Sequence, residues 1–222
     1  MKVANLNVHA LSGNRIDRLI KEVIEPNKLD VLFLQEIHYG TIKLLAKKLG
    51  WKFYHCYYCG IISKNSIDVV SEKFQVGRSF ARSVFRAKIP VNGKKKTFVM
   101  THLDHISELT RMKQLQLIKN YYKDADFFLG DFNALNPGDY QEKDWKDIVS
   151  VRNKLKLEVT KPFVIEQIKS CGFSINPYLG PTTPYNTRVD YFCYKDKFGG
   201  DFFMIDTMGP KISDHNMIGI KF

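Results

Sequence analysis

The chain has 222 residues, 44% of them hydrophobic, and its 34 Lys and Arg against 23 Asp and Glu give a net charge of +11. With 14 Gly, 8 Pro and 4 Cys, this composition excludes a fibrous chain, a disordered chain and a disulfide scaffold. No run approaches the roughly 18 apolar residues of a membrane span. The length predicts one domain over residues 1–222.

The positive charge favours an acidic partner, with nucleic acid ahead of an anionic membrane surface. A basic surface without such a partner is the alternative, because Lys is scattered and the only tight run, Lys94–Lys96, follows Asn92-Gly93 at an expected hairpin tip. Met1–Asn5 has the pattern of a strand, with no basic segment leading into a long apolar run. We therefore expect a cytoplasmic protein without membrane insertion, and take it to be a monomer.

The first part of the chain predicts alternating strands and helices. Residues 2–9 form the first expected strand, and a helix follows with Asn14 as N-cap and Pro26 near its end. Val31–Leu34 is a continuous apolar run typical of a strand buried on both faces, and residues 40–49 predict a helix. Short aromatic and β-branched runs then predict a meander of strands at 52–58, 60–63, 81–90 and 96–102.

The second part begins with a helix capped by Ser107. Its expected buried face carries apolar residues at helical spacing, namely Leu109, Met112, Leu115, Ile118 and Tyr122. The elements expected after it are a strand at 126–129, helices near 139–150 and 162–170, and strands near 189–194, 202–205 and 216–221. No linker divides the chain, so the pattern predicts two packed sheets with helices outside, a mixed α/β architecture.

Cys56-Tyr57-Tyr58-Cys59 is formally a CxxC segment. It lacks a second pair at zinc spacing and lies in an aromatic, strand-like run, so we expect a structural role.

Several predicted strands run directly into acids, amides or His. These segments are Asn5–His9, Leu34–Glu36, Met100–His105, Leu129–Asn133, Arg188–Tyr191 and Ile212–Asn216. A single such residue is most often a turn residue or a structural His. The repetition of acids, amides and imidazoles at strand ends instead indicates one shared polar site.

The residue types suit phosphoester hydrolysis. Glu36 and Asp214 offer hard oxygen ligands for Mg²⁺, with Mn²⁺ as a substitute, and no Cys/His cluster indicates zinc. His102 and His215 are candidates to exchange protons near neutral pH. A divalent cation with such groups fits in-line attack on a phosphoester.

The segment Gly130–Leu135, GDFNAL, follows an apolar strand. A turn is the simple interpretation. Asp131 and Asn133 are two residues apart, however, so an extended backbone would direct both side chains to one side. They are then candidates to hold a water or metal and to position an oxygen.

This ordered set of motifs resembles the endonuclease/exonuclease/phosphatase superfamily, which includes deoxyribonuclease I, exonuclease III-type abasic endonucleases, tyrosyl-DNA phosphodiesterases, sphingomyelinases and inositol-polyphosphate 5-phosphatases. The motifs follow the family order, with Asn7, Gln35-Glu36, Thr101–Leu103, Gly130–Asn133, Arg188–Tyr191 and Ser213–His215. The resemblance implies an α+β, four-layered α/β/β/α sandwich of the deoxyribonuclease I type. Two packed mixed β-sheets are flanked by helices, and the site lies at one end of the sheets.

The resemblance also implies a role for each residue. Glu36 would bind the metal, with Asn7 and Asp214 nearby. Asp190 would hold His215 and fix its tautomer, as in other acid–His pairs.

Asp131 would activate or hold the attacking water, Asn133 would orient the phosphate, and His102 would stabilise the charged pentavalent oxygens. Whether Asp131 or His215 is the general base stays open. Arg188 and Asn7 are candidates to bind the substrate phosphate, and a structural pairing of Arg188 with a carboxylate is the alternative.

The sequence departs from the abasic endonucleases in two places. Asn5–His9 lacks the Trp that often precedes the family Asn, and His9 stands where those enzymes usually have Asp. Thr101–Leu103 is unlike their Tyr-bearing segment and looks more like tyrosyl-DNA phosphodiesterases, sphingomyelinases and unassigned bacterial-type members. These differences argue against a standard abasic endonuclease.

We therefore expect a Mg²⁺-dependent phosphodiesterase acting on nucleic acid, DNA first, as a nuclease or in DNA-end repair. A phospholipid or small-molecule phosphoesterase, sphingomyelinase- or inositol-phosphatase-like, is the alternative. The third hypothesis is a domain that only binds. Its signature would be the loss of Glu36, Asp131, Asn133 or His215, and all four are present.

Overall fold

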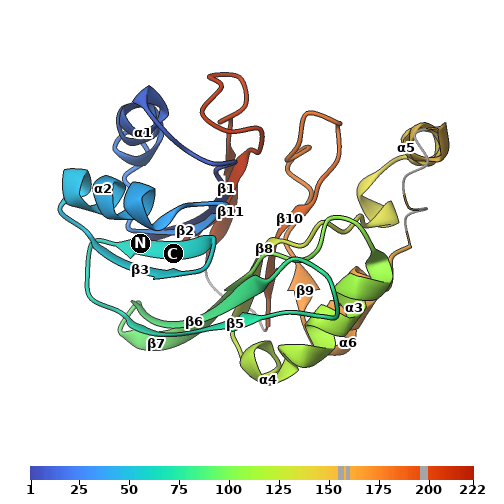
Figure 1. The fold of residues 1–222 in the computed structure, drawn as a ribbon, viewed down its shortest axis with the longest axis horizontal. Coiled ribbons are helices and arrows are strands. Elements are labelled where there is room, and N and C mark those ends of the chain that lie inside the picture. The colour runs from blue at the N-terminus through green and yellow to red at the C-terminus, as the bar shows by residue number, and fades with distance from the viewer. Residues whose placement is uncertain (155–157, 159–160, 196–199) are drawn as a thin grey trace.

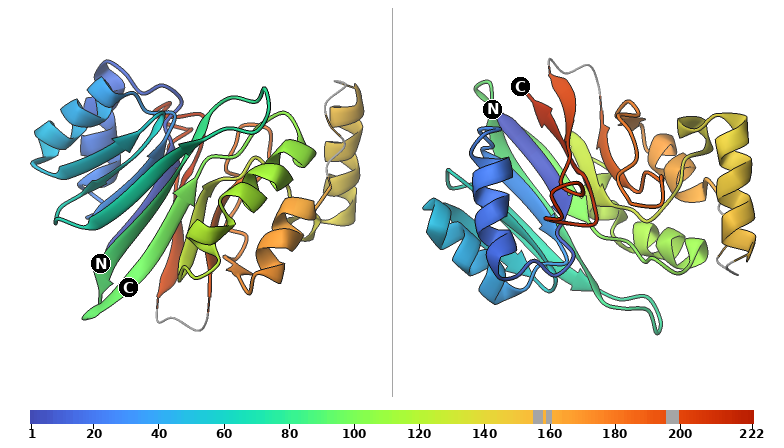
Figure 2. Two further views of the ribbon diagram at one scale, coloured as in Figure 1. Left: turned by 60° about the horizontal axis from the view of Figure 1, so that its bottom comes forward. Right: turned by 90° about the horizontal axis from the view of Figure 1, so that it is seen from above.

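The computed structural model describes residues 1–154, 158, 161–195 and 200–222. Within these residues the strands form two six-stranded mixed sheets that pack face to face, and helices cover both outer faces (Figures 1 and 2). The predicted α/β/β/α sandwich is therefore confirmed.

The first sheet has the strand order β11-β12-β1-β2-β4-β3. Its strands are β1 (Lys2–Asn7), β2 (Val31–Gln35), β3 (Lys52–Cys56), β4 (Cys59–Ser63), β11 (Asp201–Ile205) and β12 (Met217–Lys221). Its outer face is covered by α1 (Asn14–Arg18), the π-helical segment η1 (Leu19–Ile24) and α2 (Tyr39–Leu49). The first helix is capped by Gly13, so the predicted cap Asn14 is already its first residue.

The second sheet has the order β5-β6-β7-β8-β10-β9. Its strands are β5 (Asp68–Phe74), β6 (Arg82–Val91), β7 (Lys94–Thr101), β8 (Phe127–Asp131), β9 (Ser174–Ile175) and β10 (Asp190–Tyr194). Its outer face carries α3 (Glu108–Leu117), α4 (Lys119–Tyr122) and α6 (Phe163–Ser170). The short turn η2 (Pro137–Asp139) precedes α5 (Glu142–Lys154), which buries none of its described side chains and stands at the edge of the molecule (Figure 1).

The layer between the two sheets is an apolar core of aliphatic side chains with a cluster of Phe rings. Phe98 stacks on Phe127 with ring centroids 4.5 Å apart, and Phe33 and Phe192 pack beside them. Each of these rings is fully buried, and burial of one such side chain stabilises the fold by roughly 1.5–3 kcal/mol. The two sheets are thus held together by apolar contact along their facing surfaces.

Three local expectations differ from the structure. Ser107 caps α3 as predicted, with its Oγ accepting from Thr110 N, but Leu109 is 64% exposed. The inward face of α3 carries instead a buried ion pair, because Arg111 Nη2 lies 2.7 Å from Glu108 Oε2. The edge strand β5 and the two-residue β9 were not predicted, and the helix expected near 139–150 begins only at Glu142.

The CxxC segment forms the tip of the β3–β4 hairpin, where Cys56 and Cys59 are register partners and free thiols. Burial raises the pKa of Cys59 to about 12, despite a hydrogen bond with Ser83 that lowers it. A thiol in this state is unreactive, as expected for a structural role.

Candidate active site

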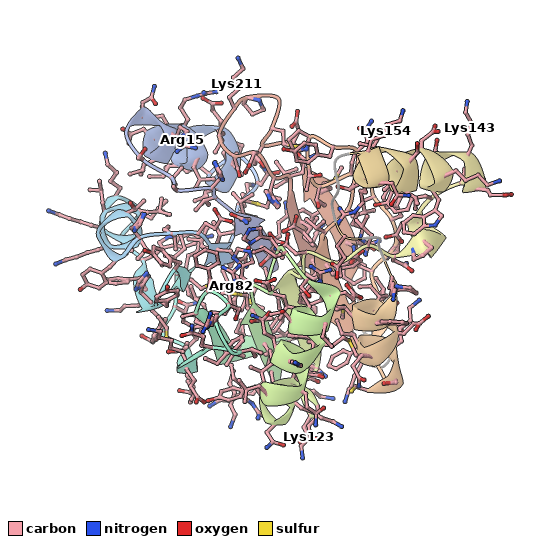
Figure 3. All side chains as sticks on the ribbon, turned by 45° about the vertical axis from the view of Figure 1, so that its right-hand side comes forward. Arg15, Arg82, Lys123, Lys143, Lys154 and Lys211 are labelled. Carbon is pink, nitrogen blue, oxygen red and sulfur yellow. The ribbon has the colours of Figure 1, made fainter. Side chains whose placement is uncertain are left out.

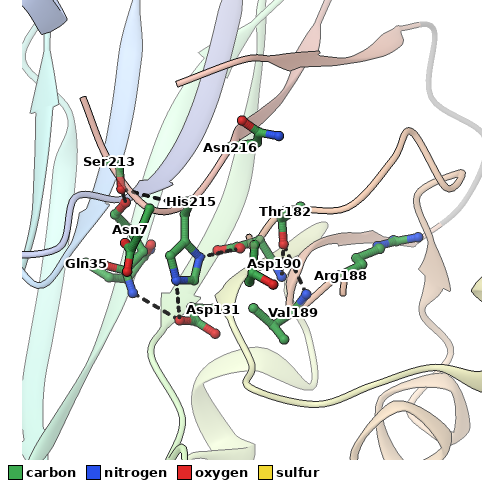
Figure 4. Close-up of polar contacts among 12 residues, drawn as sticks. Asn7, Gln35, Asp131, Thr182, Arg188, Val189, Asp190, Ser213, His215 and Asn216 are labelled. Atoms are coloured by element: carbon green, nitrogen blue, oxygen red, sulfur yellow. Dashed lines mark hydrogen bonds and ion pairs between the residues drawn. The ribbon is translucent and has the colours of Figure 1, made fainter. Parts of the chain in front are cut away.

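The polar strand ends meet at one end of the two sheets. In each sheet one neighbouring pair is parallel, β1 with β2 and β7 with β8, while β12 and β10 run antiparallel to β1 and β8. The carboxyl ends of the parallel strands therefore lie beside the amino ends of the antiparallel ones. This brings together Asn7, Glu36, His102, Asp131, Asp190, Asp214 and His215, several of which are drawn in Figure 4.

Gly130 allows β7 and β8 to approach closely at this end. Its φ is +139°, and a Cβ built there would lie 1.9 Å from the Thr101 carbonyl oxygen. Only glycine fits both the backbone conformation and the space. The close approach sets His102 Nε2 3.5 Å from Asp131 Oδ2, so the glycine of GDFN positions the two groups beside it.

Asn133 has a different backbone conformation from the one predicted. Its φ is +49°, so the backbone is left-handed and the extended geometry assumed for Asp131 and Asn133 is wrong. The Asn133 backbone N donates instead to Asp131 Oδ1 (2.9 Å). Its Nδ2 then lies 3.2 Å from His102 Nε2 and donates to the Leu103 carbonyl (3.2 Å), so the amide holds the His102 ring.

Asn7 links the two sheets through hydrogen bonds. Its Nδ2 donates to Glu36 Oε1 (3.0 Å) in its own sheet and to Asp131 Oδ2 (3.0 Å) in the other. Ser213 Oγ donates to the Asn7 carbonyl (2.6 Å) and accepts from the backbone N of His215 (3.1 Å), as Figure 4 shows. The loop before β12 is thereby fixed against the end of β1.

His215 is paired with a buried carboxylate. Its Nδ1 lies 2.8 Å from Asp190 Oδ2, and its Nε2 lies 4.0 Å from Asp131 Oδ2 (Figure 4). Burial alone would lower the pKa of His215, but the charge and hydrogen bond of Asp190, helped by Asp131 and Asp214, raise it to about 10. These surroundings favour the protonated form of His215, whose Nε2 faces Asp131.

His102 is in the opposite state. Burial lowers its pKa to about 4, and the charge of Arg82 acts in the same direction, although the negative charge of Asp131 opposes both. Burial likewise raises the pKa of Asp131. The surroundings therefore shift the pKa values of the two candidate proton-exchanging His residues in opposite directions, that of His102 downward and that of His215 upward.

Two predicted metal ligands flank a third, unpredicted group. His9 Nδ1 lies 3.5 Å from Glu36 Oε2 and 3.4 Å from Asp214 Oδ2. Asp214 Oδ1 is buried and has no hydrogen-bond partner among the described residues. Two carboxylates from different strands, one with an unsatisfied oxygen, form a donor set that suits a hard divalent cation.

A second, more compact group also has the composition of a metal site. The ligand atoms of Asp131, Asp190 and His215 lie within 4.8 Å of one another. His215 Nδ1 already contacts Asp190 Oδ2 at 2.8 Å, and its Nε2 faces Asp131, so these three side chains suit either a cation or a shared proton. Glu36 and Asp214 form a separate oxygen-rich pair around His9.

Arg188 does not face the site. Its guanidinium is buried, with Nη2 donating to Asn176 O (2.9 Å) and Oδ1 (2.7 Å) and Nη1 lying 3.3 Å from Asp139 Oδ1. The group stacks over the Tyr191 ring, 4.4 Å from its centroid, and points away from Asp190 in Figure 4. These contacts match the alternative expectation, in which Arg188 has a structural role as the partner of a carboxylate.

The sequence predictions missed two residues beside the site. His9 had been noted only as a departure from the abasic endonucleases, and Arg82, the first residue of β6, carries no motif at all. The pairing of Val84 with Thr101 shows that Arg82 lies at the same end of the sheet as His102, and the charge of Arg82 acts on that imidazole.

Residues 4–215 match the family model described as "Endonuclease/Exonuclease/phosphatase family". A comparison with curated proteins gives no match. Among solved structures, a family protein from Leptotrichia buccalis has a TM-score of 0.71 at 18% identity, covering 100% of this chain and 99% of its own. Humanized D. rerio TDP2 has a TM-score of 0.65 at 18% identity, covering 100% and 99%. The Bacteroides thetaiotaomicron mannosyl-6-phosphatase has 0.64 at 14%, covering 100% and 98%.

Proposed function

The chain belongs to the endonuclease/exonuclease/phosphatase family, whose members hydrolyse phosphoesters, and from that membership we propose that it is a Mg²⁺-dependent phosphodiesterase acting on DNA. The observation that carries the proposal is the surroundings of Asp131. This buried carboxylate is contacted by Asn7 from one sheet and lies beside His102 and His215, at the meeting point of the strand ends. A carboxylate so placed can take a proton from a water while the amide and the imidazoles beside it contact the phosphate.

Glu36 and Asp214 would hold the divalent cation, with the Asn7 amide beside them. The fit rests on the unsatisfied Asp214 Oδ1 and on the oxygen-rich donor set, which suits Mg²⁺ and accepts Mn²⁺. When bound, the cation supplies Lewis-acid neutralisation of the charge that develops on the phosphate.

Asp131 is the general base in this proposal. Its pKa is raised by burial, which strengthens its capacity to take a proton from the attacking water. His215 is unsuited to that role because its pKa of about 10 keeps it protonated at neutral pH. As a cation held by Asp190, it stabilises the pentavalent phosphate and can donate a proton to the leaving oxygen.

His102 and Asn133 act as neutral groups on the same phosphate. The 3.2 Å contact between Asn133 Nδ2 and His102 Nε2 keeps both side chains oriented before substrate binds. Because these dipoles are already oriented, no free energy is spent on reorienting them when charge develops on the phosphate.

The net charge of +11 supports a polyanionic substrate. Lys123, Lys143 and Lys211 lie on different sides of the molecule in Figure 3, so the attraction is spread over the surface. No helix within the described ranges is both long and apolar enough to cross a bilayer. The alternative substrate is a small phosphoester, because a mannosyl-6-phosphatase is among the similar folds.

The test is a substrate panel of single-stranded, nicked and abasic DNA, RNA, sphingomyelin and a sugar phosphate. Each is incubated with Mg²⁺, with Mn²⁺ and with EDTA. We expect DNA cleavage that needs the cation, is lost in Glu36→Ala and His215→Ala, and persists in Glu22→Ala, an exposed acid on η1. If phosphocholine or inorganic phosphate is released and no DNA is cleaved, the substrate is a phospholipid or small phosphoester instead of DNA.

A further inference from the structure

His9 occupies the space between the two carboxylates that the proposed function assigns to the metal. Its Nδ1 lies within 3.5 Å of one oxygen from each, although Glu36 follows β2 and Asp214 precedes β12. The side chain is 62% exposed, so burial does not force it into this position. An imidazole nitrogen within 3.5 Å of both carboxylates is available as a third ligand to a cation that they would hold.

The backbone around His9 is built to present this ring. His9 and Ala10 have φ values of +41° and +52°, a left-handed conformation that side chains other than glycine adopt at a cost. Three hydrogen bonds hold it, from Val8 N to Gln35 O (3.0 Å), His9 N to Asn7 Oδ1 (3.1 Å) and Ala10 N to Glu36 O (3.1 Å). The loop is thus fixed to the residues that flank Glu36.

We propose that His9 is a nitrogen ligand of the cation site and shifts its preference from Mg²⁺ toward Mn²⁺ and the later divalent transition metals. Mg²⁺ prefers oxygen ligands, whereas imidazole suits the transition metals. Two carboxylates and one imidazole form a mixed set that still accepts Mg²⁺ but binds Mn²⁺ or Co²⁺ more tightly. This inference rests on the proposed metal site at Glu36 and Asp214.

The experiment measures cation binding to the protein alone, without turnover. Mn²⁺ affinity, and its competition by Mg²⁺, are followed by electron paramagnetic resonance in wild type, His9→Ala, His9→Asp and the control His105→Ala, an exposed His in another loop. In His9→Ala the preference for Mn²⁺ over Mg²⁺ should fall on the order of tenfold or more. In His9→Asp the binding of Mg²⁺ should improve.

An unchanged Mn²⁺/Mg²⁺ ratio in His9→Ala would overturn the inference, provided that Glu36→Ala weakens Mn²⁺ binding. If Glu36→Ala also leaves the binding unchanged, the metal site itself is wrong and the proposed function fails with it. The nitrogen hyperfine coupling of bound Mn²⁺ gives a second readout, and it should diminish in His9→Ala but not in His105→Ala.

A different observation assigns a role to Arg82. Its Nε is buried without a hydrogen-bond partner, and its one described polar contact joins Nη2 to His105 Nδ1 at 3.5 Å. Among the described residues it forms no ion pair, whereas the buried Arg111 and Arg188 each have carboxylate partners. An unpaired guanidinium near His102 has the donors that a phosphate oxygen requires.

We infer that Arg82 binds a substrate phosphate, the role predicted for Arg188. Arg82→Gln should raise KM, and the dissociation constant of inorganic phosphate, roughly tenfold to a hundredfold, the worth of a charge-assisted hydrogen bond. The thermal midpoint should stay unchanged. Arg86→Gln is the matched control, since it lies on the same strand, four residues further from the site.

Phosphate binding is measured calorimetrically, so the outcome does not depend on the identity of the substrate. Equal phosphate affinity in wild type, Arg82→Gln and Arg86→Gln would overturn the assignment, whether or not DNA is cleaved. An Arg82→Gln variant that lost stability but kept phosphate affinity would make Arg82 a structural residue instead.

Discussion

His102 and His215 face the same carboxylate, with Nε2 atoms 3.5 Å and 4.0 Å from Asp131 Oδ2, yet their pKa values are shifted in opposite directions. Burial dominates at His102, whose nearest polar side-chain contact is the Asn133 amide at 3.2 Å. His215 has in addition the buried carboxylate of Asp190 at 2.8 Å, which outweighs its burial. Two titratable groups whose surroundings push their pKa values apart are characteristic of a site with separate acid and base roles.

The first prediction concerns the imidazole titrations of the cation-free protein. With EDTA present, His102 should stay neutral down to about pH 4 and His215 should stay protonated up to about pH 10. Nuclear magnetic resonance of the ring nitrogens measures both. In Asp190→Asn the pKa of His215 should fall while that of His102 changes little, and two titrations near pH 6.5 in wild type would contradict the assignment.

The second prediction is a pH dependence of folding stability due to His102. Its pKa is about 4 in the folded protein and 6.5 unfolded, so between these values the unfolded chain binds the extra proton. The free energy of unfolding should therefore decrease as pH falls from 6.5 to 4, by about 3 kcal/mol from this group. Urea unfolding of wild type and His102→Gln across this window isolates the effect, because the variant lacks it. Parallel curves would rule it out.

The third prediction concerns Gly130. In Gly130→Ala the new methyl group meets the Thr101 carbonyl and the backbone keeps a φ of +139°, so the variant should lose about 3 kcal/mol of stability. Gly138→Ala, in the η2 turn that follows β8, is the control, since its Cβ would lie 3.6 Å from the nearest atom. Chemical denaturation measures both. A Gly130→Ala protein as stable as the control would show that the strands can separate freely.

The fourth prediction separates structural from functional arginines. Arg188→Met leaves Asp139 and Asn176 buried without their cation, so it should destabilise the fold by roughly 3–5 kcal/mol. The KM of the protein that remains folded should be unchanged. If Arg188→Met raises KM and leaves the free energy of unfolding unchanged, Arg188 binds substrate and is not a structural residue.

The sandwich fold and the meeting of polar strand ends could be predicted from the sequence because both depend on local patterns. Apolar strands that stop at an acid or amide are visible residue by residue, and parallel neighbours bring such ends together. Local conformations that tertiary contacts impose could not be predicted in this way. Leu109 has the spacing of a core residue, but α3 turns Arg111 inward because Glu108 compensates its charge there. Asn133 is left-handed because Asp131 accepts its backbone N–H.

The position of Arg82 illustrates the same limit. Its sequence neighbours form an ordinary strand, and only the pairing of β6 with β7 brings it to the same end of the sheet as His102. Arg188 lies within a family motif, and the sequence leaves open whether it binds the phosphate or has a structural role. Asn176, a distant residue in no motif, binds its guanidinium. Which arginine is free is decided by long-range partners.

The buried hydrogen bond from Asn7 to Asp131 crosses from one sheet to the other, so neither sheet holds a whole site. The distance between the two halves depends on the apolar layer between the sheets, which includes Phe98 and Phe127. The proposed activity therefore depends on how closely the sheets pack. A solvent, temperature or substitution that loosens this layer should lower the proposed activity before the chain unfolds.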